Sequence, residues 1–286
     1  MIKNNTQAFY LEAKKSLGQN FLKDNSVIEN IVDNIVFLSD KSQQKLVHEI
    51  GPGSGAITKP LLERGLKVTA LEKDKRALDG LQQTLGKEYS DKLRLIETDI
   101  LKFDPSVFIE SEKPLCFGNI PYYITSDIML WFCKHKQFYS HGIFMVQNEV
   151  ADRLQAKHRT KDYSRISVKM QLNFTVEKLF VVPASAFVPK PKVNSAIIKL
   201  TPKDFSFPSL EKEKSFESFC ALLFSARRKM LRRVLHSQLQ DMDEKQRQVF
   251  WEKCALIQVF EDTRPDAISP QAILDLYFNS EQRLDL

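Results

Sequence analysis

Short apolar runs alternate with helically spaced apolar residues along the first 200 residues of the chain. The runs are rich in Val, Leu, Ile and Phe, as buried strands are, and lie at residues 46–50, 67–71, 93–97, 115–118 and 142–146. Helical spacing is found at residues 25–37, around Ile57, Leu61 and Leu62, and at residues 75–85. Asn25 or Ser26 is the expected cap of the first helix. The alternation predicts an α/β domain built on a doubly wound, mostly parallel sheet.

The pattern changes after residues 193–200, the last segment with strand character. Residues 201–208 contain two prolines and are typical of a linker, and the residues beyond them have the pattern of helices. A chain of 286 residues suggests two domains, at about 150 residues each. We therefore expect one domain over residues 1–202 and a helical domain over residues 203–286.

A doubly wound sheet binds its ligand beyond the carboxyl ends of its strands. The loops at those ends would hold Gly51, Gly53, Gly55, Glu72, Asp99 and Asn119. Glycines let the backbone turn tightly beside a ligand, although an ordinary strand-to-helix turn has the same pattern. Glu72 could accept hydrogen bonds from both ribose hydroxyls of an adenosine-containing cofactor, and Asp99 could meet an adenine amino group. These loops indicate nucleoside recognition and leave the kind of cofactor open.

The cluster Asn119-Ile120-Pro121-Tyr122 follows the fourth predicted strand and suggests the chemistry. The amino group of adenine is a poor nucleophile because its lone pair is delocalised into the ring. Two acceptors on its hydrogens favour the tetrahedral geometry needed to attack a methyl donor: the side-chain carbonyl of Asn119 and the backbone carbonyl of Ile120, held by Pro121. Tyr122 can stack on the base. A strand-ending turn is the structural alternative for this cluster.

Composition places the chain among globular proteins, with 43% hydrophobic and 27% charged residues. No apolar run approaches the roughly 20 residues of a membrane span, and residues 1–16 lack the apolar stretch of a secretory signal. The cysteines, Cys116, Cys133, Cys220 and Cys254, are scattered and form no C-x-x-C pair. We therefore expect reduced thiols, a cytoplasmic location and no metal site.

The net charge of +6 is unevenly distributed. Residues 203–286 hold 13 Lys and Arg against 14 Asp and Glu, so the excess of positive charge lies in residues 1–202. One exception is the run Arg227-Arg228-Lys229-Met230-Leu231-Arg232-Arg233, which we expect on a helix. Five cations in seven residues without acids between them favour contact with RNA phosphates, and a solvated or ion-paired helix face is the alternative.

Eight blocks of the sequence, in the family's order, resemble the ribosomal RNA adenine-N6,N6-dimethyltransferases, specifically the bacterial small-subunit group. They are SLGQNFLKD (16–24), VHEIGPGSGAIT (47–58), LEKD (71–74), FGNIPYYIT (117–125), FMVQNEVADRL (144–154), YSRISV (163–168), VPASAFVPKPKVNSAIIKL (182–200) and RRKMLRRVL (227–235). The resemblance implies a Rossmann-like class I methyltransferase domain followed by a small all-α domain. It also implies S-adenosylmethionine as methyl donor and, as target, N6 of two adjacent adenosines in the 3′-terminal hairpin of small-subunit (16S) rRNA.

Matching positions within these blocks imply site residues. The donor site would be lined by Asn20, Leu22, Gly51, Glu72, Asp99 and Asn119, and Gly53 belongs to the same glycine loop. Phe187 would be the second aromatic wall beside the target base, with Pro189 and Pro191 holding it off any strand; packing at the domain junction is its alternative. Lys190 and Lys192 lie beside Phe187 and suit phosphates.

Three positions depart from the family pattern, namely Leu17, Tyr123 and Asn148, and they bear on base fit and RNA affinity rather than on the reaction. We expect the chain to act as a monomer on an immature small ribosomal subunit. One rival function is that of the large-subunit rRNA methyltransferases, although residues 263–269 resemble the small-subunit group's C-terminal block. Another is an assembly checkpoint that binds the subunit and for which methyl transfer is secondary.

Overall fold

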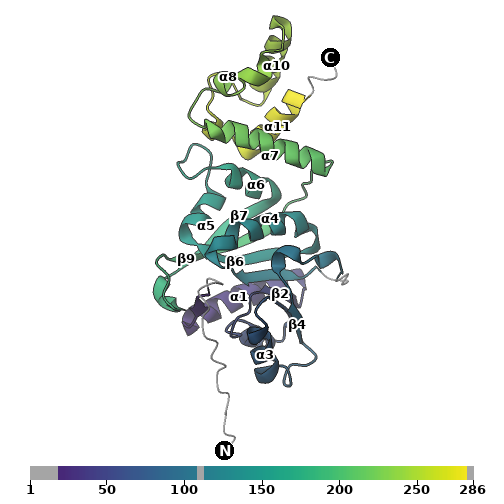
Figure 1. Cartoon of the computed structure of the whole chain (residues 1–286), viewed down its shortest axis with the longest axis vertical. Helices are drawn as coiled ribbons and strands as arrows, with labels where there is room; N and C mark the ends of the chain where they lie inside the picture. The colour runs from purple at the N-terminus through teal and green to yellow at the C-terminus, as the bar shows by residue number, and fades with distance from the viewer. Residues whose placement is uncertain (1–18, 108–112, 282–286) are drawn as a thin grey trace, which may run out of the picture. The chain divides into compact units, whose positions relative to one another are not determined.

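The computed structural model of the chain describes residues 19–107 and 113–281. Within this range it contains two compact units (Figure 1). The first unit takes its residues from the stretches up to Ala151 and from Thr175 to Pro202. The second unit takes Asp152–Phe174 and the residues from Lys203 onward. Leu17, one of the departures from the family pattern, lies outside the described residues.

The first unit is built on a seven-stranded sheet. In spatial order its strands are β4 (Leu93–Glu97), β3 (Lys67–Glu72), β2 (Leu46–Ile50), β5 (Leu115–Asn119), β6 (His141–Gln147), β9 (Ser195–Pro202) and β7 (Phe174–Val182). Strands β2 to β6 pair in parallel, whereas β9 runs antiparallel to β6. The doubly wound, mostly parallel sheet predicted from the sequence is confirmed. A separate two-stranded sheet pairs β1 (Phe21–Leu22) antiparallel with β8 (Phe187–Val188).

Helices cover both faces of the large sheet because its strands are apolar on both sides. They are α1 (Asn25–Ser42), α2 (Thr58–Glu63), α3 (Lys75–Thr84) and α4 (Thr125–His135), and α5 (Asn148–Gln155) begins in the first unit and ends in the second. Successive residues of a strand point to opposite faces. On β2, Val47 joins the core formed with α1 and α2, whereas His48 packs its ring against Phe103 and Tyr139 on the other face. Tyr139 in turn contacts Phe132 of α4.

Helix α1 has a different N-terminal cap from the one expected. The capping residue is Asp24, whose Oδ1 accepts hydrogen bonds from the backbone N–H groups of Ser26 (3.0 Å) and Val27 (3.3 Å). Asn25 and Ser26 already belong to the helix. An aspartate in extended conformation caps as well as asparagine or serine does, and it also places a negative charge at the positive end of the helix dipole.

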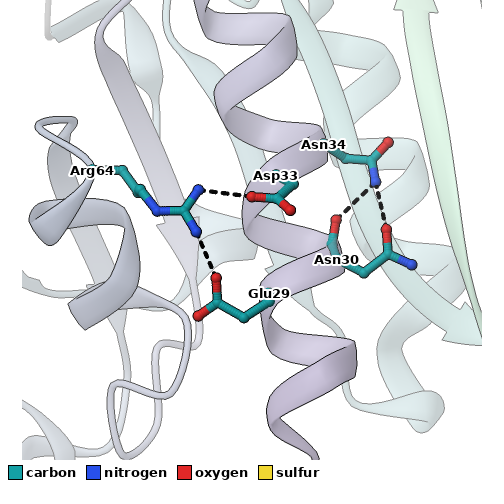
Figure 2. Close-up of polar contacts among 5 residues, drawn as sticks. All are labelled: Glu29, Asn30, Asp33, Asn34 and Arg64. Carbon is teal, nitrogen blue, oxygen red and sulfur yellow. Dashed lines mark hydrogen bonds and ion pairs between the residues drawn. The ribbon is translucent and has the colours of Figure 1, made fainter.

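Arg64, which ends α2, binds two carboxylates on α1 (Figure 2). Its Nη1 donates to Asp33 Oδ1 at 2.7 Å and its Nη2 to Glu29 Oε2 at 2.6 Å. Glu29 and Asp33 are four residues apart, so they lie on the same face of the helix. The three side chains are partly exposed, so these ion pairs contribute little to stability. Their main effect is to fix the orientation of α2 relative to α1.

The second unit is helical, as expected for the C-terminal part. Its helices are α6 (Arg165–Asn173), α7 (Leu210–Ser225), α8 (Leu231–Val234), α9 (His236–Leu239), α10 (Glu244–Leu256) and α11 (Pro270–Glu281). Helix α6 packs against α7 and α11, and the phenol of Tyr163 donates to the carbonyl of Ile268 at 2.9 Å. Residues 152–174 therefore share their apolar core with the C-terminal helices. The sequence-based division at residue 202, which left this segment in the first domain, stays a prediction.

The segment expected to be a linker is attached to the second unit by aromatic packing. Phe205 stacks edge-on to Phe207 with ring centroids 5.1 Å apart, and Phe207 lies 5.1 Å from Phe216 of α7. Strand β9 also extends through Pro202 into the expected linker. Apolar side chains of an irregular segment are still driven to bury themselves, which the turn-forming residues did not indicate.

The basic run at residues 227–233 was expected on one helix, and this was wrong. The backbone N–H of Lys229 donates to the carbonyl of Ala226 at 2.8 Å and closes a turn, and α8 starts only at Leu231. The amides of Leu231 and Arg232, which a longer helix would use internally, donate instead to the carbonyls of Thr263 and Glu261. A distant segment thus satisfies the donors at the start of α8.

Candidate active site

A cleft of about 270 Å³ opens at the carboxyl ends of the parallel strands in the first unit. The loops after β2, β3, β4 and β5 contribute to its walls, as expected for a doubly wound sheet. The structure brings together here the residues predicted for the donor and for the target base: Asn20, Leu22, Gly51, Gly53, Glu72, Asp99, Asn119, Ile120, Pro121, Tyr122 and Phe187. The roles assigned to them individually stay predictions.

The glycine loop after β2 forms the floor of the cleft because its backbone adopts conformations that side chains disfavour. Gly53 has φ +56°, and a Cβ built on it would lie 3.1 Å from the ring of Phe21. Gly55 has φ +83°, and its Cβ would lie 2.7 Å from Leu81. Glycine at these positions therefore lets the loop stay close to β1 and α3. Gly51 also lines the cleft, and a Cβ built on it would meet nothing within 4 Å, so space remains there for a ligand.

Glu72, the last residue of β3, has one oxygen held by the backbone. Its Oε1 accepts from the N–H groups of Lys73 and Asp74, both at 2.8 Å. Only 8% of the residue is exposed, and this burial raises its pKa, while the backbone N–H groups act in the opposite direction by favouring the charged form. A carboxylate fixed in this way can accept hydrogen bonds from a ligand with little further loss of conformational freedom. It fits the pair of hydroxyls of a ribose.

Asp99, which follows β4, is the more exposed of the two carboxylates. Lys73 Nζ donates to its Oδ2 at 2.9 Å, and the backbone N–H of Leu101 donates to its Oδ1 at 3.1 Å. The hydrogen bond from Lys73 lowers the pKa of Asp99, so this carboxylate is ionised at neutral pH. Its predicted role as acceptor for an adenine amino group would therefore compete with the hydrogen bond from Lys73.

Asn119 ends β5 and has a defined amide orientation. Its Nδ2 donates to the backbone carbonyl of Asn20 at 3.2 Å, so Nδ2 is the donor on that side and Oδ1 is the remaining acceptor. The next residue, Ile120, donates its own N–H to the carbonyl of Met145 on β6 at 3.2 Å. Pro121 has φ −57° and ψ 131° and starts the short turn that carries Tyr122. The two carbonyl oxygens of the predicted clamp thus stem from backbone anchored to the sheet.

Two aromatic residues line the same cleft from different elements. Tyr122 lies in a short 3-10 turn (Tyr122–Ile124), and its hydroxyl is 2.8 Å from the Oγ of Ser195, the first residue of β9. Phe187 is 2% exposed and pairs with Leu22. Phe187 was expected off any strand, which was wrong. Pro189 removes only its own N–H, so residues 187 and 188 keep the amides that β8 needs.

Ser195 and Phe21 are neighbours of the predicted site residues that sequence reasoning missed. Phe21 lines the cleft between Asn20 and Leu22, and its place between two predicted residues was a usable signal. Ser195 is 73 residues from Tyr122 along the chain, and no local pattern pointed to it. Only the pairing of β9 with β6 brings it to this edge of the sheet.

The predicted RNA-binding residues separate into two kinds. Lys190 and Lys192 in the first unit are exposed, and so are Arg228, Lys229, Arg232 and Arg233 in the second unit. Arg227 is partly buried, and its Nη1 donates to the backbone carbonyls of Lys161 and Tyr163, both at 3.0 Å. The side chain of Arg227 is thus held by its own unit, and its predicted contact with RNA stays a prediction.

The cysteines are all buried as free thiols. Within residues 19–107 and 113–281, His, Cys, Asp and Glu form no group of three or more that could hold a metal ion. In the same part of the chain, no helix combines the length and the apolar character needed to cross a membrane.

Comparison with known proteins decides the family. The model of the family described as ribosomal RNA adenine dimethylase matches residues 10–274. The chain belongs to this family. Relatives named ribosomal RNA small subunit methyltransferase A include those of Alkaliphilus oremlandii (38% identical, covering 80% of this chain and 79% of the relative) and Chlorobium chlorochromatii (42%, 77% and 80%). That of Malacoplasma penetrans is 36% identical over 93% of this chain and 92% of the relative.

Solved structures agree with the fold of the rRNA adenine dimethylase family. A dimethyladenosine transferase from Plasmodium falciparum superposes with a TM-score of 0.73 at 24% identity, covering 92% of this chain and 98% of that one. The 23S rRNA methyltransferase ErmE superposes with a TM-score of 0.65 at 25% identity, covering 92% and 100%. The predicted class I methyltransferase fold with a helical C-terminal part is therefore confirmed.

Membership of this family makes S-adenosylmethionine the methyl donor of this enzyme. The cleft suits that molecule on its own geometry. Open space adjoins Gly51, where an added Cβ would meet nothing within 4 Å, and the backbone holds a buried carboxylate, Glu72, in the wall of the same cleft. A purine nucleoside needs such a combination of close backbone approach and hydroxyl acceptors.

Proposed function

We propose that this protein transfers methyl groups from S-adenosylmethionine to N6 of two adjacent adenosines in the 3′-terminal hairpin of small-subunit rRNA. The observation that carries the proposal is the amide of Asn119, which Asn20 orients with its oxygen available at a cleft that Glu72 and Phe187 also line. The relatives named small subunit methyltransferase A support the choice of ribosomal subunit.

The proposed mechanism relies on positioning. The two hydrogens of the adenine amino group donate to Asn119 Oδ1 and to the carbonyl oxygen of Ile120, and this draws the nitrogen towards tetrahedral geometry and frees its lone pair. Tyr122 and Phe187 hold the plane of the base. The bound donor supplies an electrophilic methyl group. The methylated nitrogen is then acidic enough to lose its proton to water, so neither Asn119 nor any other side chain has to act as a base.

The proposed partner is an immature small ribosomal subunit. The protein would bind it as a monomer, in the cytoplasm. Buried free thiols suit a reducing compartment. The exposed cations Lys190, Lys192, Arg228, Lys229, Arg232 and Arg233 are the proposed phosphate contacts. None of the last four forms an ion pair within the described residues, which leaves these four side chains available to phosphates.

The test is incubation of the purified protein with immature small and large ribosomal subunits and methyl-labelled donor. We expect label in N6,N6-dimethyladenosine of the small subunit. Label confined to the large subunit would overturn the proposal in favour of the activity for which ErmE is named. Label in neither subunit would show that rRNA of these subunits is not the substrate.

The assembly-checkpoint role is tested separately, in cells that lack the native protein. The variant Glu72→Ala removes the ribose acceptor and leaves every proposed phosphate contact in place. If small-subunit maturation with this variant equals that with the wild type, methyl transfer is not the main role of the protein. Impaired maturation together with normal binding of the variant to subunits supports the catalytic role.

A further inference from the structure

The phenol of Tyr122 is fixed by a residue of another strand. Its hydroxyl lies 2.8 Å from Ser195 Oγ, and Ser195 is fully buried. Tyr122 itself belongs to a short turn, whose backbone is closed by the N–H of Ile124 on the carbonyl of Pro121 (3.2 Å) and by Thr125 Oγ1 on the carbonyl of Tyr122 (3.2 Å). These contacts hold the main chain of Tyr122. The contact with Ser195 holds the far end of its ring.

Ser195 is a rigid anchor because it lies in the large sheet. It pairs with Gln147 at the end of β6, and the next residue, Ala196, pairs with Val146. The preceding residue, Asn194, closes the loop that carries Phe187: its Oδ1 accepts from the N–H of Ala184 at 3.0 Å. Asn194, just before β9, and Ser195, its first residue, therefore tie both aromatic walls of the cleft to the start of one strand.

We infer that Ser195 is a positioning residue for methyl transfer, acting through Tyr122. This inference rests on the proposed function. A tyrosine ring has two free torsions, and a hydrogen bond at its hydroxyl removes the freedom that stacking on a base would otherwise have to restrict. With Tyr122 fixed, the stacked adenine keeps its amino group at Asn119 Oδ1. Without Ser195 Oγ, the ring still lines the cleft but the base is less often in the reactive position.

The experiment compares Ser195→Ala, Tyr122→Phe and the double variant in methylation of immature small subunits. Because one hydrogen bond contributes about 0.5–1.5 kcal/mol, we expect each single variant to lower kcat by about 3- to 10-fold, with both KM values nearly unchanged. The double variant should be no slower than the slower single variant, because both changes break the same contact. Wild-type kcat in Ser195→Ala, or losses that multiply in the double variant, would overturn the inference.

A matched control removes another buried serine hydroxyl of the first unit. Ser39, fully buried on α1, donates through Oγ to the carbonyl of Gln44 and does not line the cleft. Ser39→Ala should lower the melting temperature and leave kcat unchanged. If Ser195→Ala and Ser39→Ala lose kcat in the same proportion to their loss of stability, Ser195 has only a structural role and the inference fails.

A second measurement separates this inference from the proposed function. In protein labelled with ¹³C at tyrosine Cζ, the resonance missing from Tyr122→Phe belongs to Tyr122. We expect Ser195→Ala to shift this resonance and Ser39→Ala to leave it in place. An unshifted resonance refutes the contact. A shifted resonance in a protein that methylates no small subunit refutes the proposed function and leaves the contact established.

Discussion

The cleft of the first unit and the exposed cations of the second unit differ in how their polar side chains are held. In the cleft, two polar side chains are oriented by backbone groups: Glu72 by the N–H groups of Lys73 and Asp74, and Asn119 by the carbonyl of Asn20. Arg228, Lys229, Arg232 and Arg233 are exposed and form no ion pair with any residue that the structure describes. A nucleoside presents hydroxyls and an amine at fixed positions and requires orientation, whereas phosphates require charge. A single substitution in the cleft should therefore cause a large loss of donor affinity or kcat, whereas each substitution among the exposed cations should cause a small loss of RNA affinity.

The largest effect is expected for Glu72→Ala. Charge-assisted hydrogen bonds contribute about 1.5–3 kcal/mol each, so losing two to the ribose should weaken S-adenosylmethionine binding by at least about 100-fold. Isothermal titration calorimetry measures this directly. The control is Glu97→Ala at the end of the neighbouring strand, an exposed carboxylate outside the cleft. Donor affinity of Glu72→Ala within a few-fold of the control would contradict the ribose role.

Asn119→Ala tests orientation within the clamp. Removing one preorganised acceptor should lower kcat by about 100-fold, by analogy with the loss of one donor from an oxyanion hole. Binding to immature small subunits should hardly change, because phosphates dominate RNA affinity. Single-turnover methylation measures the first quantity and filter binding the second. Asn34→Ala, which removes an amide bound to Asn30 on α1 (Figure 2), serves as control, and full activity in Asn119→Ala would refute the clamp.

Burial in the cleft should also be visible as a dependence of stability on pH. Glu49, 2% exposed beneath the cleft and bonded to Thr58 Oγ1 at 2.7 Å, has a pKa raised by burial from 4.5 to about 7. Between these values the folded state binds more protons than the unfolded state, so the free energy of unfolding falls as pH rises. Glu49→Gln removes this cost and should stabilise the protein by about 2–4 kcal/mol at pH 8, and by almost nothing at pH 4.5.

Urea unfolding of the free protein at both pH values measures the effect of Glu49→Gln. The surface control is Glu97→Gln, for which we expect a small change at either pH. A Glu49→Gln variant whose stability relative to wild type does not vary with pH would mean that this carboxyl is solvated in solution.

The smallest and most gradual effect is expected in the cations of the second unit. Changing Arg228 and Arg232 together to Gln should weaken RNA binding and reduce its salt slope by about 1 to 2, because two phosphate contacts no longer release counterions. Donor affinity should stay the same. Arg227→Gln is the matched comparison: it should lower the melting temperature through loss of its bonds to Lys161 and Tyr163 and leave the salt slope unchanged. The reverse pattern would show that Arg228 and Arg232 are the structural pair.

The sequence by itself determined the five parallel strands and the edge of the sheet at which the cleft lies, whereas β7 and the small sheet of β1 and β8 were not predicted. Strand runs and helical spacing are local patterns, and parallel strands bring their carboxyl ends to one edge, so Gly53, Glu72 and Asn119 had to meet there. The family resemblance added Asn20 and Phe187, which no pattern of spacing linked to that edge. Local hydrogen bonding, such as that of Glu72 with the next two amides, also follows from neighbouring residues.

Only the tertiary structure decided which residues that are far apart in the sequence form hydrogen bonds with one another. Asn119 is oriented by a carbonyl 99 residues earlier, and the phenol of Tyr122 by a hydroxyl 73 residues later. The side chain of Arg227 found its acceptors in the carbonyls of Lys161 and Tyr163, more than 60 residues earlier. The basic run is not one helix, because Thr263 and Glu261 provide carbonyls to the amides of Leu231 and Arg232. Backbone donors and acceptors take whichever partner the fold places beside them, and helical spacing carries no record of that partner.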